Sequence, residues 1–197
     1  MRKYIAFIQS VSNREWEVGE IICNEIVHNP EYKECCSKVF YIKTFQELTN
    51  LLISISDNIR DALIVVQIDA HSNSEGFAFR DVNNPNKDEY SEYVEWIKFY
   101  DVLVHLHDTQ GANITLIFVS CYSSSFAESL QSPHVTIIAA EGKVSPRRAE
   151  EQLLKFYREI CMGASVEEAY ELMIKEYPIE EERNREEDNR SVLKLYK

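Results

Sequence analysis

The sequence predicts an α/β fold in which helices cover both faces of a mostly parallel sheet of about six strands. Short runs rich in Ile, Val and Phe alternate with segments of helical periodicity, a pattern typical of such sheets. The runs "ALIVVQIDA" and "NITLIFVSC" are apolar almost throughout, which indicates strands buried on both faces. With 197 residues, we expect a single domain over 1–197.

The first half of the chain contains three of the expected strands. They cover residues 3–9 ("KYIAFIQ"), 39–43 ("VFYIK") and 62–70 ("ALIVVQIDA"). An amphipathic helix follows the first strand, over "REWEVGEIICNEIVHN". Thr44 and Glu47 have the spacing of a capping box, which predicts that a second helix begins after Thr44.

The second half adds two more buried strands, over 113–121 and 134–141. A long helix follows them. Pro at the first position of a helix and Gly just after its end are both favoured, so Ser145–Pro146 begins this helix and Gly163 ends it.

The C-terminal region combines a capped helix with a charged segment. Ser165 and Glu168 form a second capping box, ahead of the helix "VEEAYELMIKEY", which Pro178 ends. The run 180–190 is dominated by charges and is interpreted as a solvated helix or linker. The last seven residues, 191–197, alternate like a half-buried edge strand.

Charge and hydropathy exclude two classes of partner. The net charge of −12 argues against direct binding of nucleic acid and against anionic membranes. No apolar run approaches the roughly 20 residues that a membrane span needs, and the N-terminal segment lacks the pattern of a secretory signal. We therefore expect a cytoplasmic protein.

The cysteines agree with a reducing compartment. Their number is odd, five, and their positions show no paired spacing, so a disulfide framework is not expected. The sequence also lacks a C-x-x-C pair or a histidine cluster, and nothing in it indicates a metal or another cofactor.

Two of the apolar runs end on residues that can carry chemistry. "LIVVQIDAHSNSEGF" ends on His71, and "LIFVSCYSSSF" ends on Cys121 and breaks into small polar residues. If these strands are neighbours, their tips lie roughly 5–10 Å apart, which suits a nucleophile and its proton-transfer partner. A buried apolar cysteine and a structural histidine are the alternatives. Asp69 projects to the same side as His71, where it could orient the imidazole, line a specificity pocket or cap a turn.

The stretches "HSNSEGF" and "LIFVSCYSS" resemble the two active-site segments of caspase-like cysteine peptidases, most closely those of bacterial CHAT domains. The interval from His71 to Cys121 is 50 residues (121 − 71), close to the caspase spacing. "EWIKFYDVLVHL" and "VTIIAAEGKVSPRRAEEQLLKFYREICMGASVEEAYELMI" are similar to later segments of the same family. The resemblance covers residues 62–175 and implies a caspase-like three-layer sandwich.

The resemblance also implies a mechanism. Cys121 would attack a peptide carbonyl to form an acyl-enzyme, and His71 would transfer protons. The backbone N–H groups of Ser72 and Cys121 would stabilise the oxyanion; Ser72 stands where the family usually has Gly but keeps the donor. Asp69 and Glu141 occupy positions from which family members contact the substrate, and their charge favours Arg or Lys before the cleaved bond.

By the same resemblance, the substrate is a protein or peptide. CHAT domains are often attached to sensor modules, so we expect a separate regulatory or sensor partner here, in a bacterial defence or cell-death pathway. A caspase-like interaction module without activity is the alternative from another class, although a scaffold needs neither His71 nor Cys121.

Two further interpretations are weaker. "IDAHSN" is similar to a metal-binding segment of arginase-like hydrolases, but Asn73 replaces the second Asp and no other Asp-x-Asp set is present. A Cys-x5-Arg phosphatase is excluded because Ala127 occupies the arginine position.

Overall fold

The computed structural model describes residues 2–11, 18–59, 62–80, 90–110, 114–129, 135–177 and 193–197. Within these residues, eight strands belong to one sheet whose main path runs β2-β1-β3-β6-β7-β8. The strands are β1 (Arg2–Ser10), β2 (Cys35–Tyr41), β3 (Ala62–Ser72), β4 (Gly76–Phe79), β5 (Glu92–Glu95), β6 (Ile114–Val119), β7 (Thr136–Ala140) and β8 (Leu193–Tyr196).

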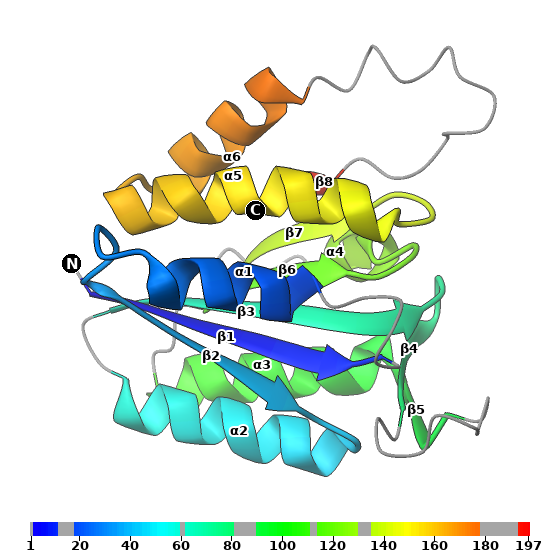
Figure 1. Cartoon of the computed structure of the whole chain (residues 1–197). Helices are drawn as coiled ribbons and strands as arrows, with labels where there is room; N and C mark the ends of the chain where they lie inside the picture. Colours follow the sequence, from blue (N-terminus) through cyan, green and yellow to red (C-terminus); the bar gives the residue numbers. More distant parts are fainter. Residues whose placement is uncertain are drawn as a thin grey trace, which may run out of the picture.

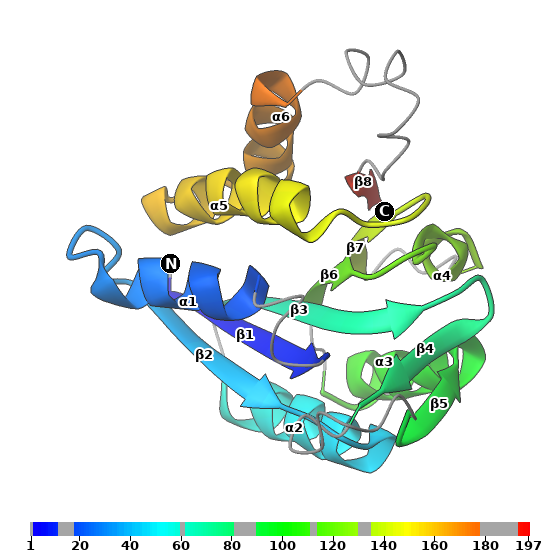
Figure 2. The ribbon, with the colours of Figure 1, turned by 45° about the vertical axis from the view of Figure 1, so that its right-hand side comes forward.

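The sheet is mostly parallel, as the sequence predicts. Strands β2, β1, β3, β6 and β7 pair in parallel, and β8 pairs antiparallel with β7 at one edge. The six strands of the main path agree with the predicted number. The β4–β5 hairpin, which pairs with the last residues of β3, was not predicted. It lies beyond the carboxyl ends of the parallel strands (Figure 2).

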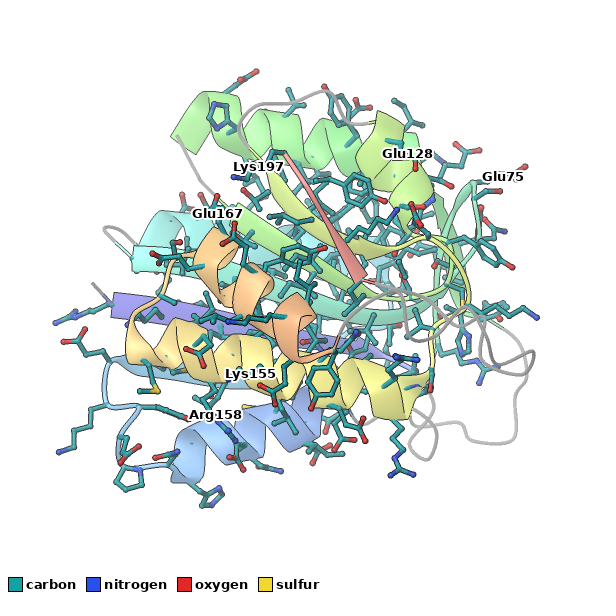
Figure 3. The ribbon with its side chains drawn as sticks, turned by 90° about the horizontal axis from the view of Figure 1, so that it is seen from above. Glu75, Glu128, Lys155, Arg158, Glu167 and Lys197 are labelled. Carbon is teal, nitrogen blue, oxygen red and sulfur yellow. The ribbon has the colours of Figure 1, made fainter. Side chains whose placement is uncertain are left out.

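Helices cover both faces of this sheet and give three layers. Helices α1 and α5 lie on one face, α2 and α3 lie on the other, and α6 packs on the outer side of α5 (Figures 1 and 3). Within the described part of the chain, no helix is both long and apolar enough to cross a bilayer. The helices are α1 (Val18–His28), α2 (Phe45–Asn58), α3 (Trp96–Gln110), α4 (Ser124–Ser129), α5 (Pro146–Met162) and α6 (Val166–Glu176).

The apolar residues form two cores, one on each face of the sheet. Because successive side chains of a strand point to opposite faces, Ile64 and Val66 of β3 pack on the α2–α3 side, whereas Val65 packs under α1 and α5. All three side chains are almost fully buried. Burial on both faces explains why the central strands are apolar without alternation.

The predicted helix signals are confirmed with two differences in detail. Both bonds of the Ser165–Glu168 capping box form, and Gly163 closes α5 in the left-handed region at φ 111°. The Ser145 side chain makes no capping bond. The Thr44 hydroxyl accepts from the Glu47 N–H at 3.2 Å, but the Glu47 carboxylate accepts from the preceding Lys43 N–H instead of closing the box.

Some strand boundaries differ from the prediction. Strand β2 begins at Cys35, four residues early, because the polar residues at its start pair with β1 at a partly exposed edge of the sheet. Strand β3 continues to Ser72 because β4 pairs with its end. The predicted strand 113–121 is β6, which ends at Val119. The predicted linker 180–190 lies outside the described residues.

Gly76 is the residue on which the hairpin depends. A Cβ built at this position lies 2.1 Å from the carbonyl oxygen of Val94 on β5, which is backbone and cannot rotate away. We expect Gly76→Ala to lower the free energy of unfolding by more than about 2 kcal/mol, because one strand of the hairpin must move. Denaturant unfolding followed by circular dichroism measures the change.

Gly163→Ala is the matched control. Its Cβ meets nothing within 4 Å, so only the positive φ opposes the side chain, and we expect a loss of about 1 kcal/mol. Equal losses in the two variants would contradict the assignment of a steric role to Gly76.

Candidate active site

The strands that carry His71 and Cys121 are neighbours. β3 and β6 pair in parallel from Ile64↔Ile114 to Asp69↔Val119, and His71 and Cys121 each follow the last pair by two residues. The expectation that the two tips adjoin at one edge of the sheet is therefore confirmed. A further contact joins the tips directly, since the Ser72 hydroxyl donates a hydrogen bond to the Cys121 carbonyl oxygen.

Cys121 lies in a turn that is anchored to the segment after β7. The backbone N–H of Val144 points at the Cys121 sulfur, with N and Sγ 3.4 Å apart. The next residue, Tyr122, has φ 57° and donates its N–H to the Gly142 carbonyl at 2.9 Å. Tyr122 is the one non-glycine residue with positive φ in the described ranges. The strained turn presents a partly exposed thiol at the sheet edge.

Ser123 fixes the base of the same turn. Its buried hydroxyl donates to the Ser120 carbonyl at 3.0 Å and accepts from the Ala140 N–H at 2.9 Å. These bonds tie the end of β6 to the end of β7. The small polar residues after Cys121 thus satisfy backbone groups where the sheet ends, and α4 begins at Ser124.

His71 lies at the junction between β3 and the hairpin. Its backbone pairs with Ala78 on β4, and the residue is partly exposed, although the Nε2 atom of the imidazole is buried. The ring of Tyr90 packs edge-to-face against the imidazole, with centroids 5.7 Å apart. The guanidinium of Arg80 lies over the Tyr90 ring, with its Cζ 5.4 Å from the ring centroid. The sequence did not predict Tyr90 or Arg80 as neighbours of His71, because it did not predict the hairpin that carries them.

The loop after His71 is a tight, well-bonded turn. The Asn73 side-chain oxygen accepts from the N–H groups of Glu75 and Gly76, at 2.8 and 3.0 Å, and from the Tyr93 hydroxyl at 3.0 Å. The Trp96 indole donates to the Asn73 carbonyl at 3.1 Å. Asn73 is therefore committed to the turn, which disfavours the arginase-like interpretation in which this position binds a metal.

Apolar packing on the α2–α3 side supports this loop. The Trp96 ring stacks against Phe77 of β4 at 5.2 Å and against Phe126 of α4 at 5.1 Å. Phe99 and Phe118 complete the aromatic cluster. One aromatic cluster thus links the hairpin, β6 and α4 next to the tips of β3 and β6.

Ser72 occupies an ordinary strand conformation. Its φ is not positive, so serine fits without strain at this position, where the resemblance described above leads one to expect glycine. Asn73 donates its N–H to Gly76 across the hairpin, and hydrogen-bonded positions alternate in antiparallel pairs. The Ser72 N–H therefore points away from β4. The Arg80 N–H, at the end of β4, donates to the Ser10 hydroxyl on β1, so β4 lies on the β1 side of β3. The Ser72 N–H therefore points toward the opposite side, where β6 lies.

Asp69 lies inside the protein, below this edge. Its side chain is 1% exposed, with one oxygen accepting from the Gly19 N–H of α1 at 2.9 Å and the other from the Gln67 amide at 2.7 Å. Burial raises the pKa of Asp69 to about 7, against the lowering effect of the two hydrogen bonds. The pKa of Tyr157 on α5 is raised by burial and by the charge of Asp69.

Glu141 does not lie beside Asp69. It is exposed at the end of β7, and its carboxylate forms an ion pair with Lys194 on the edge strand β8. Asp69 is on β3, two strand spacings from β7, or about 10 Å. The structure therefore does not join Asp69 and Glu141 in one acidic pocket, and only Asp69 shares the face and the strand of His71.

Comparison with solved structures places this geometry in a known fold. The Drosophila initiator caspase Dronc matches 98% of the chain and 78% of its own, with a TM-score of 0.61 at 13% identity. Caspase-1 from Spodoptera frugiperda matches 98% and 84%, with a TM-score of 0.61 at 12% identity.

A bacterial structure gives a similar match. A secreted C11 cysteine protease from Bacteroides thetaiotaomicron, solved with an irreversible peptide inhibitor, matches 90% of the chain with a TM-score of 0.57 at 8% identity. The chain spans 59% of the length of that protease. No protein-family model matches the sequence, and the search of curated proteins gives no match. The chain therefore has a caspase-like fold, and at these identities the comparisons show the fold alone.

The buried carboxyl of Asp69 makes stability depend on pH. With a pKa near 7 when folded and about 3.9 when unfolded, the native state keeps a proton that the unfolded chain has lost, so stability falls as the pH rises from about 4 to 7. We expect Asp69→Asn to remove this loss and to be more stable at pH 8, by at most about 4 kcal/mol.

Denaturant unfolding of both proteins between pH 4.5 and 8.5 measures the difference. The gap should widen up to about pH 7 and then stay constant, while Asp101→Asn on the exposed face of α3 should change stability by less than about 0.5 kcal/mol. A gap that does not vary with pH would show that the Asp69 carboxyl titrates alike in both states.

Proposed function

We propose that the chain is a cysteine endopeptidase in which Cys121 is the nucleophile and His71 transfers protons. The observation that carries this proposal is the placement of His71 and Cys121 at adjoining tips of β3 and β6, on the same face of a caspase-like sheet. The hydrogen bond from Ser72 to the Cys121 carbonyl supports it, because it holds the two tips in a fixed relation. Peptide substrates follow from the proposed chemistry.

In the proposed reaction, the Cys121 thiolate attacks the carbonyl carbon of the scissile bond. The C–N bond of the tetrahedral intermediate then breaks, and His71 delivers a proton to the departing amine. Water attacks the resulting thioester, with His71 accepting its proton, and Cys121 is regenerated. Positioning the imidazole against Tyr90 limits its rotation, so the ring is held for both proton transfers.

The oxyanion is assigned to the backbone N–H groups of Ser72 and Cys121. The alternation of hydrogen bonds in the hairpin directs the Ser72 N–H to the side of the sheet where Cys121 lies. In a well-studied protease such a donor contributes about 3–4 kcal/mol to transition-state stabilisation. The serine side chain is not needed for this role, since its hydroxyl is used in binding the Cys121 carbonyl.

On the sequence resemblance, we propose a regulated effector protease of the CHAT type, acting in the cytoplasm in bacterial defence or cell death and controlled by a separate sensor protein. The acidic surface, with a net charge of −12, would attract a basic partner at long range.

Substitution of the dyad tests the proposal. We expect Cys121→Ala and His71→Ala each to reduce peptide cleavage at least roughly a thousandfold, because neither group has a substitute in the mechanism. Cys36→Ala, at the exposed amino end of β2, should cleave like the wild type and serves as the matched cysteine control. Cleavage-site mapping in a proteome treated with wild type or Cys121→Ala measures the effect.

A peptidyl electrophile directed at cysteine peptidases separates the enzyme from an interaction module of the same fold. An enzyme should be labelled at Cys121 much faster than a free thiol, and His71→Ala should slow the labelling. Labelling of Cys121 at the rate of a free thiol, together with an absence of cleavage by the wild type, would favour the module.

A further inference from the structure

A pair of thiols lies at the amino ends of the strands, at the other end of the sheet from the proposed dyad. The side chain of Cys161, in the last turn of α5, is a hydrogen-bond partner of the Cys35 side chain at the start of β2. Cys161 is buried in the core on the α1–α5 side, and Cys35 packs against this core while it remains partly exposed. One residue of the pair can therefore be reached from solution, whereas the other is enclosed.

Further contacts hold the start of β2 against α5. The Arg158 guanidinium, one helical turn before Cys161, donates a hydrogen bond to the Tyr32 hydroxyl. The Tyr32 carbonyl in turn accepts from the Cys35 N–H at 2.9 Å. On its other side, Cys35 pairs with Lys3 in the parallel register of β1 and β2. The position of Cys35 beside Cys161 is thus fixed by the backbone and by a neighbouring side-chain contact.

The surroundings favour the thiolate at Cys35. The hydrogen bond from the Cys161 thiol lowers the pKa of Cys35 most, partial burial opposes this effect, and the charge of Lys3 lowers the pKa further. The charge of Glu34 has a smaller, raising effect. The pKa of Cys161 is raised by the same hydrogen bond, by burial and by the charge of Cys35. A partly exposed thiolate next to a second thiol is the arrangement found in redox-sensing sites.

We propose that Cys35 and Cys161 are a redox site that forms a reversible disulfide by exchange with a small-molecule disulfide. The Cys35 thiolate attacks one sulfur of the small disulfide, whose S–S bond breaks and releases a first thiolate. Cys161 then loses its proton and attacks the Cys35 sulfur of the mixed disulfide, which releases the second thiolate. The small disulfide takes up two electrons from the two cysteines, and its two thiolates take up the two protons that the cysteines lose.

The first step prepares the second. In the mixed disulfide, Cys35 carries no charge, so the hydrogen bond to its thiolate and the repulsion by it no longer raise the pKa of Cys161. The charge of Lys3, which lowers this pKa, remains. Hydrogen-bonded sulfurs also need little movement to reach the disulfide bond length of about 2.05 Å.

The site is separate from the proposed dyad, and the inference does not depend on the peptidase function. Cys35, Lys3 and Leu63 form one row across β2, β1 and β3. His71 follows Leu63 by eight residues (71 − 63), or about 26 Å along the strand. The disulfide closes a loop over 35–161 that contains β3 and β6, so it restricts the unfolded chain and favours the folded one.

The test is disulfide mapping on the full chain after incubation with oxidised glutathione, with the remaining thiols blocked in denaturant. Mass spectrometry of unreduced peptides should find Cys35 joined to Cys161, and reduced glutathione should reverse the bond. Linkage of Cys36 in place of Cys35, a glutathione adduct that persists on Cys35, or two free thiols at these positions would overturn the proposal.

Single substitutions separate the two steps. Cys161→Ser should stop the reaction at the mixed disulfide, so that glutathione stays on Cys35, and Cys35→Ser should leave the buried Cys161 unmodified. Cys36→Ser, at the exposed neighbouring position, is the matched control and should form the disulfide at the wild-type rate. Circular dichroism reports whether each variant is folded, and if Cys161→Ser is not, the mapping of the wild type decides by itself.

Unfolding in urea tests the consequence for the fold. The oxidised wild type should unfold at a higher urea concentration than the reduced protein, whereas Cys161→Ser given the same treatment should show no such rise. An equal or lower midpoint for the oxidised wild type would refute the stabilising role of the bond.

Discussion

The parallel pairing of β3 with β6 is the constraint on which the candidate site depends. Helices pack on both faces of this pair, so its register is fixed by two cores at once, and a shift by one residue would turn apolar side chains of both strands to the wrong face. The register in turn fixes which residues lie at the sheet edge. His71 and Cys121 are brought together by the aliphatic residues behind them, and their own contacts only refine the arrangement.

Asp69 is an exception to the apolar burial that fixes the rest of the sheet, because a carboxyl group is buried there. A carboxyl with a pKa near 7 inside the sheet–helix layer lowers stability at neutral pH, and the neighbouring polar atoms without partners add to that effect. Groups that destabilise a fold are typical of functional sites, and Asp69 lies next to the edge that carries the proposed dyad. The same contrast separates Asp69 from Glu141, which is exposed and ion-paired and therefore needs no such explanation.

The sequence predicted the layers and placed His71 and Cys121 at the ends of two strands, with their tips adjoining if those strands are neighbours. Those features follow from apolar runs and capping signals that act locally, as at Ser165 and Gly163. The β4–β5 hairpin was missed because its first strand has four residues and owes its pairing to β3. The surroundings of Asp69 could not be predicted either, since Gly19, Gln9 and Tyr157 reach it from three separate elements. Asp69 and Glu141 were expected to contact the substrate from the positions that the family resemblance implies, and such positions do not show how deeply each side chain is buried.

The indole of Trp96 connects the core on the α2–α3 side to the loop at the rim of the sheet. Its ring belongs to the aromatic cluster on the α2–α3 side, while its nitrogen holds the loop that follows His71. Fluctuations that release this loop must therefore disturb a packed core instead of fraying alone. We therefore expect the loop to open together with the core, so that its amides are protected from hydrogen exchange nearly as well as those of the interior although they lie at the rim.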